Sequence, residues 1–342
     1  MSDQISNQMM EGILSWYDDN ARELPWRAKP SNPYHVLLSE FMLQQTTVAT
    51  VKDYFFRFIS RWPTIEDLAD ETDEEIMREW AGLGYYARAR NLLKTVREIK
   101  RLGYFPNTAK ELLTLAGVGP YTSAAIASIG FDEAILPRDG NINRILARVR
   151  GIYDPINRPS LQLAEAALNW AHPIRSGDLA QALMDLGATV CRPINPKCDH
   201  CPLRRGCFAN LKGETDELPV KIKLKAKKQQ TAHAFIILTK DGRIGFERRA
   251  EMKLLGNQWA LPTSEWVKDA TFEPPIAGNW EPHGEIKHVF THIDLRLQLW
   301  LLRLDDAPQS NEITFMGPSD ISISHLPRLW GKALEKLGLF AH

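Results

Sequence analysis

Four cysteines lie within one short run of this chain, and they constrain its folding more than any other feature. They are Cys191, Cys198, Cys201 and Cys207, spaced C-x6-C-x2-C-x5-C, and the sequence contains no other cysteine. Thiols gathered in this way are expected to act together, either as the ligands of an iron–sulfur cluster or a zinc ion or as two disulfides.

The spacing favours an iron–sulfur cluster over the other two. The sequence opens with the polar stretch MSDQISNQMMEG, so we expect a reducing compartment, where disulfides rarely persist. Zinc sites often combine two C-x2-C pairs, but only Cys198 and Cys201 form such a pair, with His200 between them. Spacings of six, two and five suit a cubane cluster in which each iron takes one thiolate, and zinc stays open as the alternative.

Length and charge set broader limits. A chain of 342 residues is long enough for two domains. Its 42 acidic and 42 basic residues balance, so the net charge gives no indication of a nucleic-acid partner, although a basic face can be offset elsewhere. No apolar stretch is long enough to span a membrane, and we expect a soluble, cytoplasmic protein.

Residues 1–212 have an almost wholly helical pattern, which predicts one helical domain. Segments such as TIEDLADETDEEIMREWAGLG carry apolar residues at three- and four-residue spacing. Thr64, Thr72 and Thr108 are each followed three residues later by an acidic residue, which is a helix-start signal.

The composition and the periodicity change after this domain. Residues 213–231 include the lysine-rich stretch ELPVKIKLKAKKQQT, which we interpret as a solvated linker with phosphate contacts as a secondary role. Within residues 232–342, AHAFIILT and RIGFERR flank a turn at 240–242 and predict a β-hairpin, and the alternation from Ile293 to Leu301 predicts a half-buried strand. A closing helix around LPRLWGKALEKLG makes this second domain α+β.

A glycine-rich turn joins two apolar helices at about residues 109–130. The stretch ELLTLAGVGPYTSAAIASIG places Gly117 and Gly119 in the turn and Pro120 at the first position of the second helix, where proline is well tolerated. Free backbone N–H groups at such a helix start can bind a phosphate without reading the base sequence. The alternative is an ordinary helical hairpin, because glycine turns are common.

Two carboxylates have contrasting predicted surroundings. Glu40 lies in YHVLLSEFMLQQT, a helix that is apolar on nearly every side, so burial should favour its protonated form and suit a general acid. Asp139 precedes the helix GNINRILARVR, whose N–H groups and dipole should keep it ionised. Each has a structural alternative, since Glu40 can be a buried partner of Arg27 or Arg88 and Asp139 a plain N-cap. Together, a neutral acid and an anion suit cleavage through an oxocarbenium-like state.

With these residues the chain resembles the MutY family, the adenine DNA glycosylases of the helix-hairpin-helix superfamily. The matching stretches run in order from residue 24 to residue 207 and are LPWR, SEFMLQQT, GLGYYARARNL, LAGVGPYTSAAI, DGNINRILAR, ALMDLGATVC and CPLRRGC. A weaker match around LLGNQWALP and KHVFTHIDLRL is similar to the Nudix-like domain that distinguishes adenine glycosylases from endonuclease III. The resemblance implies a mainly α, two-lobed helix-hairpin-helix glycosylase domain with a 4Fe–4S cluster at 191–207. A C-terminal α+β Nudix-like domain for 8-oxoguanine recognition would follow at 232–342.

The resemblance also implies the reaction. The substrate would be adenine mispaired with 8-oxoguanine or guanine in duplex DNA, flipped out of the helix during base excision repair. Glu40 would protonate N7 of the adenine and help to manage water, and Asp139 would stabilise the sugar cation. Tyr121 falls where endonuclease III-like enzymes carry a Schiff-base lysine, so the enzyme should remove the base without cutting the strand.

Further residues receive roles from the same resemblance. Arg27 would lie near the flipped base and Asn141 beside the catalytic aspartate, and the four cysteines would bind the cluster. The other predicted DNA-binding residues are Gln45, Thr46, Leu83, Tyr85, Gly117, Gly119, Phe290, Thr291 and His292. Thr291 stands where many relatives have serine, so we expect recognition of the oxidised guanine to hold with altered tightness.

The sequence departs from the family pattern in two other places. Pro137 and Arg138 precede the catalytic aspartate where small or aliphatic residues are usual. Residues 232–342 contain no Nudix box, so the second domain should bind rather than hydrolyse.

Two other function classes stay open at this point. A bifunctional endonuclease III-like pyrimidine glycosylase and lyase is disfavoured by Tyr121 in the place of lysine and by the additional domain. A non-catalytic, cluster-bearing DNA-binding protein is disfavoured because Glu40 and Asp139 are both present. For the adenine glycosylase we expect a monomer bound to duplex DNA in the nucleoid, without a membrane partner, and the resemblance leaves binding of a replication clamp open.

Overall fold

The computed structural model describes residues 3–222, 226–250, 254–256, 258–290, 292–310, 312–317 and 326–339. The chain divides into two compact units, Met1–Glu79 with Ala87–Lys223 and Trp80–Tyr86 with Leu224–His342. The short segment that contains Leu83 and Tyr85 therefore groups with the second unit. Among the described residues, no helix has the length and apolarity needed to cross a bilayer.

The first unit is helical, as the periodicity predicted. Its α-helices are α1 (Asp3–Asn20), α2 (Pro33–Leu43), α3 (Val48–Arg61), α4 (Ile65–Asp70), α5 (Asp73–Trp80), α6 (Ala87–Leu102), α7 (Ala109–Leu112), α8 (Pro120–Phe131), α9 (Gly140–Arg150), α10 (Leu161–Leu168), α11 (Ser176–Thr189) and α12 (Phe208–Lys212), with short 3-10 turns at Cys198–His200 and Arg204–Gly206. All three predicted helix starts are confirmed, because the hydroxyls of Thr64, Thr72 and Thr108 accept hydrogen bonds from the backbone N–H three residues later.

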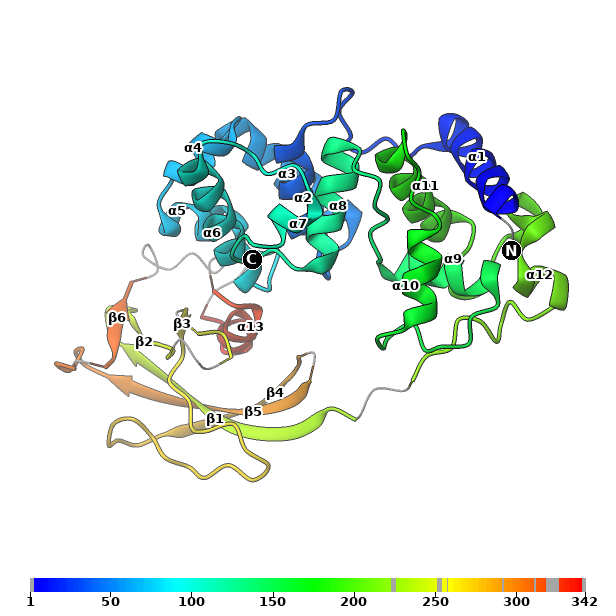
Figure 1. The fold of residues 1–342 in the computed structure, drawn as a ribbon. Helices are drawn as coiled ribbons and strands as arrows, with labels where there is room; N and C mark the ends of the chain where they lie inside the picture. The colour runs from blue at the N-terminus through cyan, green and yellow to red at the C-terminus, as the bar shows by residue number, and fades with distance from the viewer. Residues whose placement is uncertain are drawn as a thin grey trace. The chain divides into compact units, whose positions relative to one another are not determined.

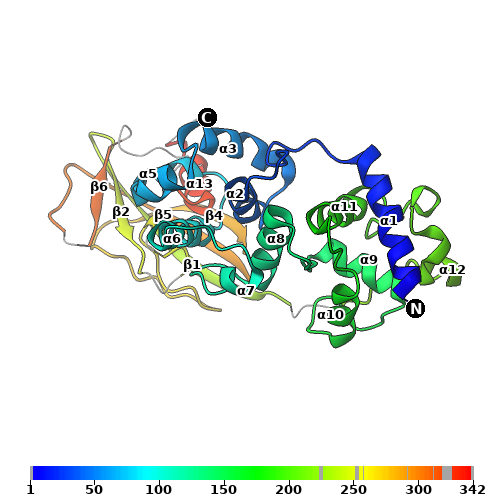
Figure 2. The ribbon, with the colours of Figure 1, turned by 45° about the horizontal axis from the view of Figure 1, so that its top comes forward.

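These helices form two groups (Figure 1). In one group, α2 packs against α3, α6 and α8. In both views α1, at the start of the chain, lies with α9 to α12 (Figures 1 and 2). A single core joins that second group through Ile13, Leu146, Leu163, Leu183 and Ala209. The predicted two-lobed arrangement is confirmed, and the two ends of the helical domain lie in the same lobe.

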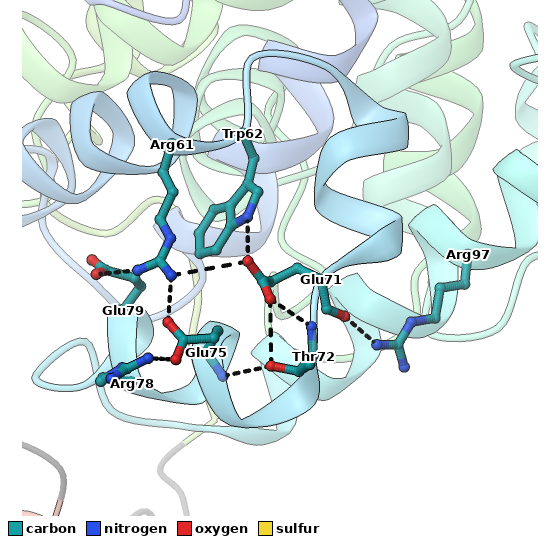
Figure 3. Close-up of polar contacts among 8 residues, drawn as sticks. All are labelled: Arg61, Trp62, Glu71, Thr72, Glu75, Arg78, Glu79 and Arg97. Carbon is teal, nitrogen blue, oxygen red and sulfur yellow. Dashed lines mark hydrogen bonds and ion pairs between the residues drawn. The ribbon is translucent and has the colours of Figure 1, made fainter.

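Ion pairs and hydrogen bonds hold the short helices α4 and α5 to their neighbours (Figure 3). Arg61 of α3 pairs with Glu75 and Glu79 of α5. Arg97 of α6 donates to the carbonyl oxygens of Ala69 and Glu71 at 3.2 and 2.8 Å, at the end of α4. Each exposed pair contributes little alone, but several of them act on helices of only six and eight residues.

The second unit is built on a mixed sheet, with strands β1 (Lys228–Thr239), β2 (Ile244–Arg248), β3 (Trp259–Ala260), β4 (Glu281–Val289), β5 (Ile293–Leu304) and β6 (Thr314–Met316) and helix α13 (Arg328–Lys336). The strand order is β3-β2-β1-β5-β4, with β6 paired to β2. β1 and β5 are parallel, and the other pairs are antiparallel. The predicted hairpin, the half-buried strand and the closing helix are all present.

The two faces of this sheet are covered differently. Leu295, Leu297 and Leu299 of β5 are buried in one core with Trp330 and Leu334 of α13. This alternation is why β5 could be predicted from its period of two. On the opposite side, aromatic rings pack edge to face around Phe235, Phe272, Trp280 and Trp300.

The linker predicted at residues 213–231 is shorter than expected. β1 already begins at Lys228. At the other end, Leu218 is buried in the core of the first unit, and the backbone N–H of Ile156 donates to the carbonyl of Val220 at 3.0 Å. Apolar residues interleaved with the lysines find partners there, which the charge run alone did not indicate. Lys223 and Lys225 of that run lie outside the described residues.

Candidate active site and DNA-binding elements

Glu40 lies on the buried side of α2. Asn32 caps this helix and Pro33 occupies its first turn, so the chain direction is set seven residues before the carboxylate. Leu37 and Phe41 beside it are fully buried, and Glu40 itself is 7% exposed. The pKa of Glu40 is raised to about 7, mainly by burial; the hydrogen bond from Tyr121 opposes this rise, and the negative charge of Asp139 adds to it. The predicted general acid therefore has the environment that favours its neutral form.

Helix α8 brings Tyr121 to this carboxylate. Gly119 is the N-cap and Pro120 the first residue of α8, so Tyr121 is the second residue of this helix. The phenol donates to Glu40, and burial raises the pKa of Tyr121 well above its ordinary value of 10.0. The side chain thus stays a neutral hydrogen-bond donor, at the position where a lysine amine would have permitted imine chemistry.

Asp139 caps α9, and the cap is part of the same site. Its carboxylate accepts hydrogen bonds from the backbone N–H of Ile142 at 2.7 Å and from Nδ2 of Asn141 at 2.9 Å. We expected the helix start to keep this group ionised, but burial raises its pKa, with those hydrogen bonds acting in the opposite sense. Burial therefore raises the pKa of both carboxyls, and at Asp139 the hydrogen bonds at the start of α9 oppose that rise.

Asn141 is held by a residue that the sequence did not single out. Nη2 of Arg144 donates to Oδ1 of Asn141 at 2.8 Å and to the carbonyl of Gly187 at 2.7 Å, and its Nε donates to the carbonyl of Cys191 at 2.8 Å. A Cβ on Gly187 would lie 2.5 Å from the Cβ of Asn141, so glycine is required for α11 to approach α9 here. A continuous set of hydrogen bonds therefore joins the backbone of the first cysteine to Asp139.

Arg27 has a different partner from the one that its sequence position suggested. Its guanidinium donates to both oxygens of Asp185, at 2.7 and 2.8 Å, and Arg22 binds the same carboxylate through Nε at 2.6 Å. Asp185 is completely buried in α11. Arg27 acts on Glu40 only through its charge, which lowers the pKa of that group. Sequence reasoning missed Asp185, although an acidic residue within the apolar stretch ALMDLGATVC was a usable signal.

The predicted phosphate-binding turn is a tight hairpin. Gly117 has φ of +91°, and a Cβ there would lie 2.7 Å from the Cβ of Asn91 in α6, so only glycine fits. The hydroxyl of Thr95 donates to the carbonyl of Ala116 at 2.8 Å and supports the turn from the same helix. Gly119 has open space where a Cβ would be, which leaves the N-terminus of α8 accessible.

The other predicted DNA-binding residues differ in exposure. Gln45 is exposed in the turn between α2 and α3, with Thr46 half-buried beside it. In the segment Trp80–Tyr86, Tyr85 is 51% exposed with a left-handed backbone, whereas Leu83 is 5% exposed. Tyr85 is therefore the side chain that this segment presents to solvent.

The β4–β5 connection carries the predicted lesion-sensing residues. The ring of Phe290 stacks on Trp266 with centroids 5.6 Å apart, and His292 is exposed. The carbonyl of Phe290 accepts a hydrogen bond from Nζ of Lys227 at 2.9 Å. Thr291 lies outside the described residues.

The four cysteines line one pocket in the lobe formed by α1 and α9 to α12. Arg148 lines the pocket too, with Nη1 donating to Sγ of Cys191 at 3.3 Å and its backbone carbonyl accepting from Sγ of Cys207 at 3.5 Å. Four soft sulfur donors around one space fit an iron–sulfur cluster or zinc. In the part of the chain that the structure describes, no three His, Cys, Asp or Glu side chains converge as ligands of a single ion.

Comparisons with known proteins agree for both units. Residues 38–170 match the family described as HhH-GPD superfamily base excision DNA repair protein, and residues 233–336 match the NUDIX domain. The chain is 35% identical to the adenine DNA glycosylase of Mus musculus, covering 87% of this chain and 71% of that protein. It is 38% identical to the adenine DNA glycosylase of Buchnera aphidicola subsp. Baizongia pistaciae, with 85% of each covered.

Solved structures share the fold of the first unit. A thermostable thymine-DNA glycosylase superimposes with a TM-score of 0.55 at 28% identity, over 60% of this chain and 97% of that one. An endonuclease III trapped in a covalent intermediate with DNA superimposes with a TM-score of 0.52 at 22% identity, over 62% of this chain and 99% of that one.

Proposed function

The chain belongs to the adenine DNA glycosylase family, and we propose that it excises adenine paired with 8-oxoguanine or guanine and leaves the DNA strand intact. It is a base excision repair enzyme that hydrolyses N-glycosyl bonds. The observation that carries the reaction is the pairing of Glu40 with Tyr121, close enough to Asp139 for the two carboxylates to influence each other.

The two carboxylates divide the chemistry. Glu40, with its pKa raised to about 7, donates a proton to the leaving adenine, which makes the base a better leaving group. Asp139, oriented by its two hydrogen bonds, stabilises the positive charge that develops on the sugar. The hydroxyl of Tyr121 keeps the carboxyl of Glu40 in place for the transfer.

The absence of an amine at residue 121 supports a monofunctional enzyme. A phenol cannot form an imine with the sugar, so no elimination step follows base removal. The product would then be an intact strand with an abasic site. This distinguishes the proposal from a glycosylase and lyase of the endonuclease III type.

We further propose that the four cysteines hold a 4Fe–4S cluster, which would supply a structural cross-link within the lobe formed by α1 and α9 to α12. Arg148 would balance its negative charge through the contact with Cys191. Four basic residues of the same loop would offer positive charge to the DNA backbone, namely Arg192, Lys197, Arg204 and Arg205. Its oxidation state does not enter the excision chemistry proposed here.

Recognition of the opposite base would fall to the β4–β5 connection and to the turns that carry Gln45 and Tyr85. Phe290 and His292 lie at the β4–β5 connection, with Thr291 between them in the sequence. Gln45 and Tyr85 are exposed on their turns and would enter the duplex. Specificity for 8-oxoguanine would therefore depend on both units.

One assay tests this function. A duplex with adenine opposite 8-oxoguanine is incubated with the protein, and half of each sample is treated with alkali. Strand breakage only after alkali is the expected result. Breakage without alkali would show lyase activity, and no breakage in either half would show a protein that binds without excision. Thymine opposite 8-oxoguanine serves as the control duplex.

A further inference from the structure

The turn between α2 and α3 holds an unusual backbone conformation. Gln45 has φ of +57°, a strained conformation that residues other than glycine rarely adopt. The side chain of Gln45 is exposed, so its own packing does not explain the strain. Such a conformation persists when the surrounding structure determines it.

Arg88 of α6 holds the turn in this conformation by hydrogen bonds on both sides of Gln45. Its Nη1 donates to the carbonyl oxygens of Phe41 and Met42 at 3.1 and 2.6 Å, and its Nη2 donates to Oγ1 of Thr46 at 3.0 Å. The residue is 6% exposed. One guanidinium therefore binds the backbone before Gln45 and the side chain after it.

Arginine suits this position through its positive charge and through a fixed donor geometry that lysine lacks. The carbonyls of Phe41 and Met42 end α2, where the helix dipole is negative, and a buried cation is favoured there. Because the donors of a guanidinium are fixed in one plane, binding both flanks leaves the intervening residue little freedom. The N–H of Thr46 adds a bond of 3.2 Å to the carbonyl of Leu43.

We propose that Arg88 is a positioning residue for lesion recognition, which keeps Gln45 in its left-handed, outward conformation before DNA arrives. This inference rests on the proposed function, in which Gln45 enters the duplex. Preorganising the turn lowers the entropy lost on binding. Arg88 acts on the encounter with the duplex and leaves the proton transfer from Glu40 unchanged.

The first test compares Arg88→Lys with Arg97→Lys. Arg97 lies on the same helix and also donates to carbonyl oxygens at a helix end, but at α4 instead of α2 (Figure 3). Single-turnover excision is measured as a function of enzyme concentration. For Arg88→Lys we expect the half-saturating concentration to rise roughly tenfold, the effect of losing about one charge-assisted hydrogen bond, with the saturating rate constant nearly unchanged. Arg97→Lys should change neither quantity.

The second test separates positioning from general packing. Asparagine adopts left-handed backbone conformations several-fold more readily than other non-glycine residues, so Gln45→Asn relieves part of the strain. Arg88→Lys should therefore cost less affinity in the Gln45→Asn background than in the wild type. An equal cost in both backgrounds would contradict the inference.

Hydrogen exchange gives a readout that needs no DNA. In the free protein, Arg88→Lys should accelerate exchange of the amides at 44–47 and leave those of α4 and α5 unchanged. If Arg88→Lys does not fold, Thr46→Val removes one acceptor and should show the same acceleration in smaller degree. Wild-type rates at 44–47 in both variants would overturn the inference, whereas failure of the wild type to excise adenine would overturn only the proposed function.

Discussion

Replacing Glu40 by glutamine should inactivate the enzyme and stabilise its fold at neutral and alkaline pH. The carboxyl is almost fully buried between apolar neighbours, and glutamine keeps its shape without the capacity to ionise. Because the amide cannot deliver the proton, excision should be lost. The same change removes the cost of burying a negative charge.

The expected size follows from the pKa. In the folded chain the pKa of Glu40 is about 7, against an ordinary value of 4.5. The folded state therefore binds more protons than the unfolded state between these values, and the wild type loses stability as pH rises through that window. The loss is complete above pH 7 and amounts to about 3 kcal/mol, because each pKa unit corresponds to about 1.4 kcal/mol. Glu40→Gln should escape it.

Urea unfolding of the protein, followed by the circular dichroism of its helices at several values between pH 4.5 and 8.5, measures this difference, because nearly all the helices lie in the first unit. The variant should gain stability over the wild type steadily up to about pH 7 and hold the gain beyond it. Glu66→Gln is the matched control, since it makes the same chemical change at an exposed position on α4. A pH-independent difference for Glu40→Gln would refute the burial argument. Wild-type excision should also decline as pH rises through about 7, because the acid form is lost.

Four further predictions follow from the site. Asp139→Asn should abolish excision and leave duplex binding, measured by fluorescence anisotropy, within a few-fold of the wild type; retained excision would contradict the assigned role. Arg144→Lys should lower the saturating excision rate by roughly tenfold, since it breaks the hydrogen bond to Asn141 that orients the amide beside Asp139. An unchanged rate would show that this hydrogen bond does not contribute to excision. Gly117→Ala should destabilise the hairpin and weaken binding to undamaged duplex, whereas Gly119→Ala, with open space around it, should fold normally, as thermal unfolding will show. Purified protein should contain iron and absorb visible light, whereas a colourless preparation loaded with zinc would exclude the cluster.

Much of the fold was predictable because its determinants are local. The caps at Thr64, Thr72 and Thr108 are interactions across three residues, and the period of two in β5 reflects burial of one strand face. The glycine turn at 117–119 was also visible, since positive φ and close packing leave few alternatives to glycine. The motif resemblance added the pairing of Glu40 with Asp139, which neither residue shows by itself.

The partners of buried charges were not predictable in this way. Arg27 pairs with Asp185, 158 positions away, and Arg88 binds the turn at Thr46, 42 positions away. Nothing in the local pattern selects these partners, because either arginine could equally have faced Glu40. The rise in the pKa of Asp139 could not be predicted either, since the helix start was visible in the sequence and the extent of burial was not.

The sequence by itself therefore determined most of the elements and the family, and it indicated that the four cysteines share one site. Short-range backbone chemistry and the spacing of reactive side chains are written into consecutive residues. Tertiary structure alone decided which helices bring Glu40, Tyr121 and Asp139 together, and how deeply each is buried. The reason is physical, because desolvation and long-range ion pairing depend on what surrounds a group in space, and chain order does not encode that surrounding directly.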